Sequence, residues 1–155
     1  MFKDFKISSY RGDYSVEFMP WQAVLKQQIV EGDVVIVDSK IIELYPLIVS
    51  VIYGNQTVVI TASETAKTYS AIGDIIKEII EGGFSKNNRL IAIGGGITQD
   101  VTSFAASILY RGVDWIFFPT NLATQADSCI GSKTSVNLDV YKNQLGGFHP
   151  PRKIF

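Results

Sequence analysis

The chain has 155 residues, of which 46% are hydrophobic and 19% charged, and its formal net charge is −1. This length suits one domain with a substantial core. The near-neutral charge argues against a partner recruited by a global field, such as nucleic acid or an anionic membrane. Residues 1–88 carry 8 basic and 11 acidic side chains, whereas residues 89–155 carry 6 and 4. An anionic ligand is therefore expected in the second part.

The chain contains one cysteine and one histidine. Cys129 cannot form an internal disulfide, which is typical of a protein from a reducing compartment. No apolar run approaches the roughly 20 residues that cross a membrane, and the first ten residues lack the apolar region of a signal peptide. We therefore expect a cytoplasmic protein. One His and one Cys also cannot build a zinc site of the usual nitrogen and sulfur type.

Apolar periodicity and turn residues divide the first three quarters of the chain into alternating strands and helices. In order, we expect a hairpin over 5–18, a helix over 21–30, a strand over 33–38, a helix over 41–53, a strand over 57–61, a helix up to 81, a strand over 89–93, a helix over 100–110 and a strand over 115–119. This alternation predicts a Rossmann-like α/β fold: a doubly wound, mostly parallel sheet with an N-terminal β-hairpin. Ligands of such sheets bind at the carboxyl ends of the strands.

Specific residues define several of these boundaries. Pro20 predicts the start of the first helix, because proline suits the first turn. Thr61 and Glu64 have the spacing of a capping box, which predicts that the third helix begins there. Gly82 and the glycine after it are expected to end that helix.

The periodic pattern dissolves after Pro119. Residues 120–151 are mostly polar or small and show no long period. A stretch this long without periodicity inside a compact domain is usually functional. The last four residues, Arg-Lys-Ile-Phe, resemble the start of another strand. We therefore expect residues 1–155 to be one α/β domain and a fragment of a longer chain.

Three consecutive glycines, Gly94–Gly96, follow the strand over 89–93. They have no side chains to pack and a high entropic cost on folding, which suggests that the backbone itself binds a ligand. At a helix start, free N–H groups and the positive helix end attract phosphate. The run is not the usual G-x-G-x-x-G motif, since its third position is Gln99 and no acidic residue follows at the expected place. From this motif alone, dinucleotide binding and a plain tight turn both stay open.

A second set of polar residues lies in the later part of the chain: Arg111, Asp127, Lys133, Lys142 and Asn143. Lysine and arginine donate charge-assisted hydrogen bonds to phosphate or carboxylate groups. An aspartate there could bind hydroxyls or accept a proton. Surface loops carry charges in any protein, but the glycine-rich setting between apolar strands favours a polyhydroxylated, anionic substrate.

Residues 94–150 closely resemble the 3-dehydroquinate synthase family of sugar-phosphate cyclases. The shared pattern is G-G-G-x-x-x-D, then F-A-A, R-G-V, Q-x-D-S-x-x-G-x-K-T-x-V-N and K-N-x-x-G-x-F. The match is ungapped over this stretch and thins to a pattern across residues 33–88. It implies that residues 1–155 are the NAD-binding α/β domain of an enzyme. A helical second domain would follow residue 155 and would hold zinc or cobalt through one Glu and two His. No metal ligand is then expected in this chain.

The resemblance also implies roles for individual residues. Gly95 and Gly96 would take the pyrophosphate of NAD, and a valine at Gly95 should weaken NAD binding. Other residues would lie along the cofactor: Asp38, Glu64, Lys67, Asp100, Thr120, Asn121 and Lys142. Asp127 would meet substrate hydroxyls, and Lys133 and Asn143 would hold the departing phosphate. Arg111 would reach the site of a neighbouring subunit, which implies a homodimer.

The implied reaction is the cyclisation of 3-deoxy-D-arabino-heptulosonate 7-phosphate to 3-dehydroquinate with loss of phosphate, a step of the shikimate pathway. Three residues depart from the family pattern: Gln99, Asn121 and Ser132 stand where members usually have Gly, Thr and Gly. They keep open a related cyclase with another C7 sugar phosphate. A polyol or iron-type alcohol dehydrogenase and a non-catalytic nucleotide-binding module also stay open.

Overall fold

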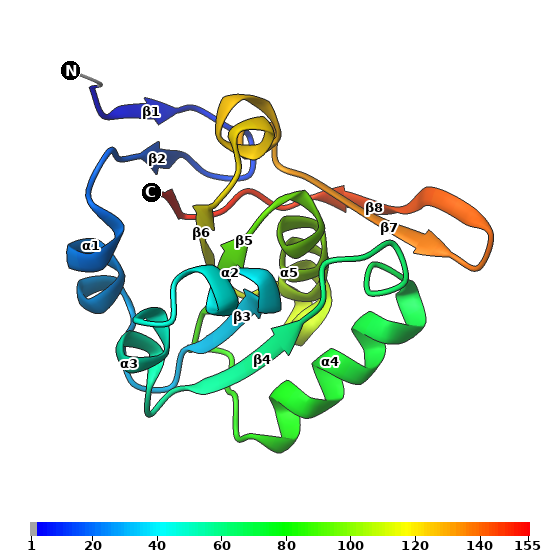
Figure 1. The fold of residues 1–155 in the computed structure, drawn as a ribbon. Coiled ribbons are helices and arrows are strands. Elements are labelled where there is room, and N and C mark those ends of the chain that lie inside the picture. Colours follow the sequence, from blue (N-terminus) through cyan, green and yellow to red (C-terminus); the bar gives the residue numbers. More distant parts are fainter. Residues whose placement is uncertain (1–2) are drawn as a thin grey trace.

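The computed structural model describes residues 3–155, and its main feature is a seven-stranded sheet (Figure 1). The strand order is β1-β2-β9-β6-β5-β3-β4, and β7 and β8 form a separate two-stranded sheet. The strands are β1 (Phe5–Ile7), β2 (Tyr14–Val16), β3 (Val34–Asp38), β4 (Gln56–Ile60), β5 (Leu90–Gly94), β6 (Trp115–Pro119), β7 (Lys133–Leu138), β8 (Tyr141–Phe148) and β9 (Lys153–Ile154).

The large sheet is parallel except at one edge. β1 and β2 form the antiparallel hairpin expected at the N-terminus, and every other neighbouring pair is parallel. The last strand, β9, lies between β2 and β6 rather than at an edge. The predicted Rossmann-like α/β class, with its mostly parallel sheet and N-terminal hairpin, is confirmed.

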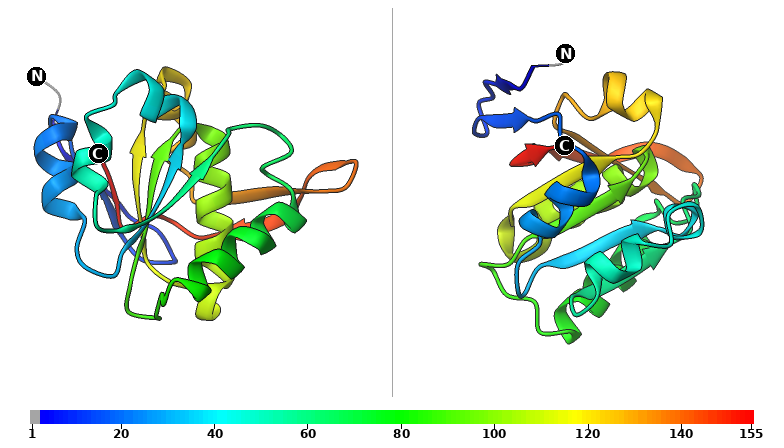
Figure 2. Two further views of the ribbon diagram at one scale, coloured as in Figure 1. Left: turned by 60° about the horizontal axis from the view of Figure 1, so that its bottom comes forward. Right: turned by 60° about the vertical axis from the view of Figure 1, so that its left-hand side comes forward.

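Helices cover both faces of the sheet, as Figure 2 shows. They are α1 (Trp21–Gln28), α2 (Ser39–Leu44), α3 (Ile48–Ile52), α4 (Tyr69–Glu81) and α5 (Gly96–Ile108), with a 3₁₀ turn η1 (Leu109–Arg111) and a short π-helix η2 (Thr124–Ser128). Alternation along each strand builds two cores, because successive side chains point to opposite faces. In β3, Ile36 packs on the face of α4 and α5, and Val37 packs on the face of α1, α2 and α3.

Two helix predictions need correction. The capping box at Thr61 does not form, because residues 64–67 form a turn and α4 begins only at Tyr69. Thr68 caps that helix instead, with its Oγ1 accepting a hydrogen bond from the Ala71 amide at 3.3 Å. The helix expected over 41–53 is interrupted at Pro46, since proline lacks the amide hydrogen that would continue it. Two short helices, α2 and α3, replace it.

The stretch after Pro119 contains more regular structure than its sequence predicts. The π-helix η2 follows β6, and β7 and β8 then form a long hairpin that projects from the body (Figures 1 and 2). β8 is exposed along nearly its whole length, so it lacks the apolar alternation that marks a half-buried strand. The strand expected at the end of the chain is confirmed as β9.

Across residues 3–155, no helix combines the length and the apolar character that a membrane crossing requires.

Candidate functional site

The sheet has a topological switch point between β3 and β5. The chain passes from β3 to helices on one face and from β5 to α5 on the other face, and it moves outward from these two strands in opposite directions. Such a point leaves a crevice at the carboxyl ends of the two strands, where open α/β sheets bind their ligands. Asp38 ends β3 and Gly94 ends β5, so the expected cofactor residue Asp38 and the start of the glycine run border this crevice.

The glycine turn lies where we expected it, at the carboxyl end of β5. Gly95 is the N-cap of α5, and the Thr120 amide donates to the Gly94 carbonyl at 3.0 Å, which joins the turn to the end of β6. A Cβ added to Gly96 would meet no atom within 4 Å, so open space lies in front of the helix start. Free amides and open space together make a cradle that fits a phosphate group of NAD.

Asn121 lies beside this turn. A Cβ on Gly95 would come within 2.3 Å of the Asn121 Nδ2 atom. The Oδ1 atom of the same side chain accepts a hydrogen bond from the Thr124 amide at 2.9 Å, which fixes the amide group at the start of η2. A side chain at Gly95 would therefore displace Asn121 before it met a ligand. Gly96 is the cleaner position at which to test phosphate binding.

The loop after β4 brings Glu64 and Lys67 to the same edge of the sheet. Lys67 is 7% exposed and its Nζ lies 2.5 Å from a carboxylate oxygen of Asp100 in α5. Glu64 accepts a hydrogen bond from the side-chain Nδ2 of Asn137 at 2.9 Å. The backbone amide of Asn137 donates to the Lys67 carbonyl at 2.9 Å. These bonds join the β4 loop, α5 and the β7–β8 hairpin into one polar cluster.

The surroundings shift the pKa values of Asp100 and Glu64, the two carboxylates of this cluster, in opposite directions. Burial raises the pKa of Asp100, although its hydrogen bond and ion pair with Lys67 act against that change. The hydrogen bond from Asn137 lowers the pKa of Glu64, and the positive charges of Lys142 and Lys67 act in the same direction. A desolvated carboxylate beside a buried lysine in a crevice is an arrangement that often marks a functional site.

Lys133 and Asn143, expected at the departing phosphate, and Lys142, expected along the cofactor, lie on the β7–β8 hairpin. Lys133 begins β7, and Lys142 and Asn143 lie in β8. Asn143 has a left-handed backbone (φ 56°), and its Oδ1 accepts a hydrogen bond from Ser135 Oγ at 2.9 Å. The Asn143 amide donates to Asn137 Oδ1 at 2.9 Å, so the backbone here is tied to the polar cluster.

Arg111 is not brought together with the others. It follows α5, which begins at the carboxyl edge of the sheet and returns the chain to the amino end of β6. Arg111 is exposed and, like Tyr110 before it, has a positive φ, which is uncommon outside glycine. Within one chain, Arg111 and the glycine turn therefore lie at opposite edges of the sheet.

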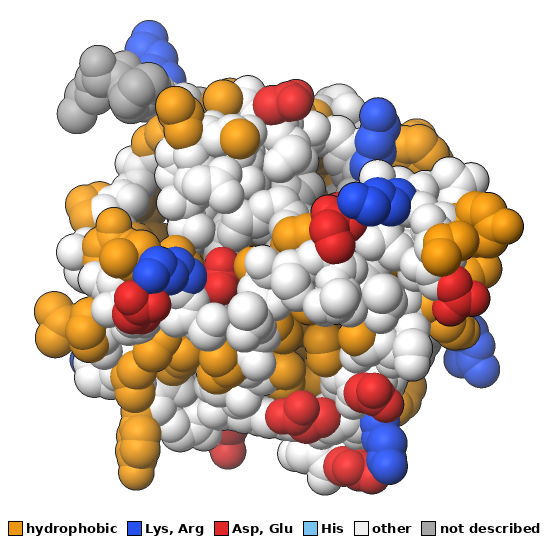
Figure 3. All heavy atoms as spheres, turned by 45° about the vertical axis from the view of Figure 1, so that its right-hand side comes forward, with side chains coloured by type: hydrophobic (Ala, Val, Ile, Leu, Met, Phe, Trp, Pro, Cys, Tyr) orange, Lys and Arg blue, Asp and Glu red, His pale blue; other side chains and the backbone are white. Residues whose placement is uncertain are grey.

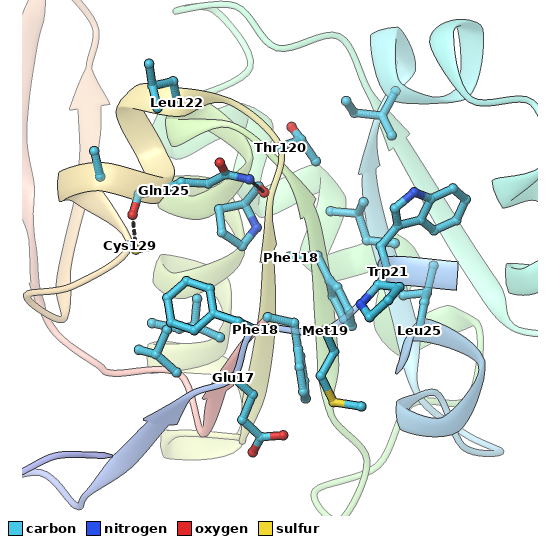
Figure 4. Close-up of a pocket in the computed structure, with 18 of the residues that line it drawn as sticks. Glu17, Phe18, Met19, Trp21, Leu25, Phe118, Thr120, Leu122, Gln125 and Cys129 are labelled. Atoms are coloured by element: carbon cyan, nitrogen blue, oxygen red, sulfur yellow. Dashed lines mark hydrogen bonds between the residues drawn. The ribbon is translucent and has the colours of Figure 1, made fainter. Parts of the chain in front are cut away.

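An apolar groove of about 840 Å³ lies beyond the end of β6 (Figure 4). Phe118 and Phe155 stack within it with ring centroids 5.1 Å apart. Thr120 and Gln125 line its border toward η2, whereas most of its wall comes from apolar side chains such as Phe18, Met19 and Trp21. This groove does not offer the charged donors that an anionic substrate needs.

On the face drawn in Figure 3, acidic and basic side chains are interspersed, and no broad area carries one sign of charge.

Cys129 is buried, and its burial raises the pKa of the thiol, which disfavours a nucleophilic thiolate.

Residues 3–155 contain no group of three or more His, Cys, Asp or Glu side chains that could hold a metal ion. The described residues therefore do not fit a metal centre.

Comparison with known proteins identifies the family. The model of the 3-dehydroquinate synthase N-terminal domain matches residues 57–155, more than half of the chain. The chain belongs to the 3-dehydroquinate synthase family. The 3-dehydroquinate synthase of Rhodospirillum rubrum is 40% identical over 101 residues, which are 65% of this chain and 26% of that protein. The synthase of Prochlorococcus marinus is 42% identical over 96 residues, which are 62% of this chain and 26% of that protein.

The matched region thus spans about a quarter of each of these members of the 3-dehydroquinate synthase family.

Solved structures of sugar-phosphate cyclases share the fold. A 2-deoxy-scyllo-inosose synthase superimposes with a TM-score of 0.85 at 25% identity, over 99% of this chain and 46% of that chain. A 2-epi-5-epi-valiolone synthase from Streptomyces hygroscopicus, solved with NAD⁺ and Zn²⁺, gives 0.77 at 26% identity over 97% and 44%. A maleylacetate reductase from Rhizobium, at 14% identity and 0.67, shows the fold alone.

Two residues of the site were not assigned roles in the sequence analysis. Asn137 is 3% exposed and links Glu64 to the Asn143 backbone. Alternation in step with Thr134 and Val136 predicts the opposite face for residue 137, so the sequence pattern carried no signal for the burial of Asn137. Gln99, noted only as a departure from the family pattern, is 6% exposed and bonded to η2. Nothing in the local sequence indicates that contact.

We expect Glu64→Gln to change how stability depends on pH. Since the Glu64 pKa is lowered from its ordinary 4.5 in the folded chain, its carboxylate stabilises the fold above that value, and this contribution disappears as the pH falls through the lowered pKa. Urea unfolding should therefore show the wild type more stable than the variant at pH 7 and equal to it at the acidic end. A difference that stays constant with pH, or one equally present in Glu31→Gln, would contradict the prediction.

Proposed function

We propose that this chain is the NAD-binding half of a phosphate-eliminating lyase of the 3-dehydroquinate synthase type. Its substrate would be 3-deoxy-D-arabino-heptulosonate 7-phosphate and its product 3-dehydroquinate, in the shikimate pathway. The observation that carries the proposal is the family match over residues 57–155 together with the glycine cradle at the switch point. A cytoplasmic location and a homodimer belong to the same proposal.

When bound, NAD⁺ would supply a reversible hydride acceptor for one ring hydroxyl of the substrate. The amides at Gly95 and Gly96 would hold its pyrophosphate, and Asp38, Thr120 and Asn121 would lie along it at the ends of β3 and β6. Lys67 and Asp100 would border the cofactor from the β4 loop and α5, with Glu64 and Lys142 beside them. Tight cofactor retention is needed, because one bound NAD⁺ would serve both the oxidation and the later reduction.

The substrate would face the hairpin side of this crevice. Lys133 and Asn143 would hold the phosphate as it leaves, since positive charge and amide donors stabilise the developing anion. Asp127, exposed on η2, would contact the ring hydroxyls. Arg111, at the opposite edge, would complete the phosphate site of a second subunit. In the complete enzyme a divalent metal, zinc or cobalt, would be held by residues outside this chain.

The test is phosphate release from 3-deoxy-D-arabino-heptulosonate 7-phosphate. We expect no turnover by the 155-residue chain with NAD⁺ and zinc, and turnover after addition of the separately expressed C-terminal part of the Rhodospirillum rubrum relative. Lys133→Met should reduce the restored rate at least tenfold, because the leaving phosphate loses a charged donor. Lys86→Met, at the amino edge of the sheet, should leave it unchanged.

Each other outcome identifies a different function. Phosphate release by the isolated chain would contradict the need for a second half. Release from a different C7 sugar phosphate alone, such as sedoheptulose 7-phosphate, would assign a related cyclase. Reduction of NAD⁺ by glycerol without phosphate release would assign a polyol dehydrogenase, and NAD⁺ binding without any turnover would leave a nucleotide-binding module.

A further inference from the structure

Gln99 makes an unusual contact near the start of α5. It lies in the first turn of that helix, three residues after Gly96, and is 6% exposed. Its Nε2 donates to the Ser128 carbonyl at 2.6 Å, and its Oε1 accepts from Ser128 Oγ at 3.1 Å. Both polar ends of one amide are thus bound to a single residue on another element. Buried amides bonded in this way hold their partner in one position, because either bond left unmade would be costly.

Ser128 is the last residue of η2 and directly follows Asp127. The other side-chain bonds that hold the front of η2 are local. Asn121 accepts from the Thr124 amide at 2.9 Å, and Gln125 Nε2 donates to the Pro119 carbonyl at 3.0 Å. These bonds connect η2 only to the chain immediately before it. The Gln99–Ser128 contact instead connects its far end to the helix whose first amides form the phosphate cradle.

Backbone bonds within η2 do not replace this contact. The Cys129 amide donates to the Thr124 carbonyl at 3.0 Å, which closes the π-helical turn but does not hold it against a neighbour. After η2, the Gly131 amide donates to Tyr14 Oη at 3.3 Å, a longer bond to the N-terminal hairpin. Among these bonds, the Gln99–Ser128 pair is therefore the side-chain contact nearest to Asp127 that connects η2 to α5.

We propose that Gln99 is a positioning residue that holds the Asp127 carboxylate against the cofactor crevice through Ser128. A role of Gln99 in catalysis rests on the proposed function, in which Asp127 contacts substrate hydroxyls. A glycine at this position, as the family resemblance expects, could not make either bond. In this chain, the Asp127 segment therefore depends on α5 through the Gln99 side chain.

The decisive variant is Gln99→Met, which keeps nearly the same volume in the buried site but removes both hydrogen bonds. Gln56→Met is the matched control, because Gln56 Nε2 donates to a backbone carbonyl of α4, that of Glu78, at 2.8 Å, remote from the crevice. Gln99→Glu retains the acceptor for Ser128 Oγ and loses the donor to the Ser128 carbonyl. Ser128→Ala removes only the hydroxyl bond, so it should show a smaller effect than Gln99→Met.

Amide hydrogen exchange on the 155-residue chain tests the contact without substrate. We expect Gln99→Met to speed exchange at residues 124–130 about tenfold, with α4 and the sheet unchanged, because local opening is governed by local contacts. Gln56→Met should not affect that segment. Unchanged exchange at 124–130, or faster exchange throughout the molecule, would overturn the proposal.

Kinetics of the complemented enzyme then test the positioning. Gln99→Met should lower kcat about tenfold with NAD⁺ affinity within twofold of wild type, since the lost contact acts on the substrate-facing carboxylate. Ser128→Ala, which removes only the hydroxyl bond, should lower kcat less than Gln99→Met does. An unchanged kcat with faster local exchange would overturn the positioning role. If the wild-type mixture releases no phosphate, the proposed function fails, and exchange alone decides whether Gln99 holds the Asp127 segment.

Discussion

Gly96→Val is expected to weaken NAD⁺ binding about a hundredfold, or nearly 3 kcal/mol. The reason is steric and electrostatic. The Gly96 Cβ position faces open space at the start of α5, where the free amides would meet a phosphate oxygen. A branched side chain there would occupy the ligand's position without contacting the protein, so the fold should be retained.

Isothermal titration of NAD⁺ into the 155-residue chain measures the effect. Gly73→Val in α4 is the matched control, because a Cβ at Gly73 also meets nothing within 4 Å and places valine in a helix. It should bind NAD⁺ as the wild type does. Equal affinities in Gly96→Val and wild type would mean that the glycines serve only the turn, and the cofactor assignment would then be wrong.

Lys67→Met is expected to destabilise the chain by about 3 kcal/mol near pH 8. The side chains of Lys67 and Asp100 are 9% and 21% exposed, so the loss leaves a carboxylate with little solvent and no cation. Burial already raises the Asp100 pKa, and removal of Lys67 should raise it further. A group with a raised folded pKa loses stability as the pH rises through that value. The penalty should therefore shrink as the pH is lowered.

Urea unfolding across pH 5 to 8 provides the measurement, and Lys40→Met provides the control. Lys40 also pairs with a carboxylate, that of Glu43 at 2.8 Å, but the two side chains are 59% and 67% exposed. Exposed pairs contribute less than about 1 kcal/mol. Asp100→Asn combined with Lys67→Met should recover much of the loss at pH 8. A Lys67→Met penalty equal to that of Lys40→Met, or one that grows toward low pH, would refute the buried-pair argument.

The sequence by itself determined the sheet and its crevice. The β-branched run that ends at Asp38, the glycines after residue 93 and the apolar strand that ends at Pro119 are local signals, since each depends on neighbours within a few residues. Such signals predicted a parallel α/β sheet, its N-terminal hairpin and a ligand edge at Gly94–Gly96. They failed at Thr61, where the capping-box spacing was present but residues 64–67 form a turn before Thr68 caps the helix.

Only the tertiary structure decided which side chains meet. Asn137 bonds Glu64 from 73 residues away, and Gln99 bonds Ser128 from 29 residues away. β9 pairs between β2 and β6, although it follows the hairpin in the chain. The hydrophobic periodicity of the sequence does not predict these contacts. They form only when separate elements pack together and their buried polar groups find partners. The position of Arg111 at the opposite edge follows in the same way from the length and direction of α5.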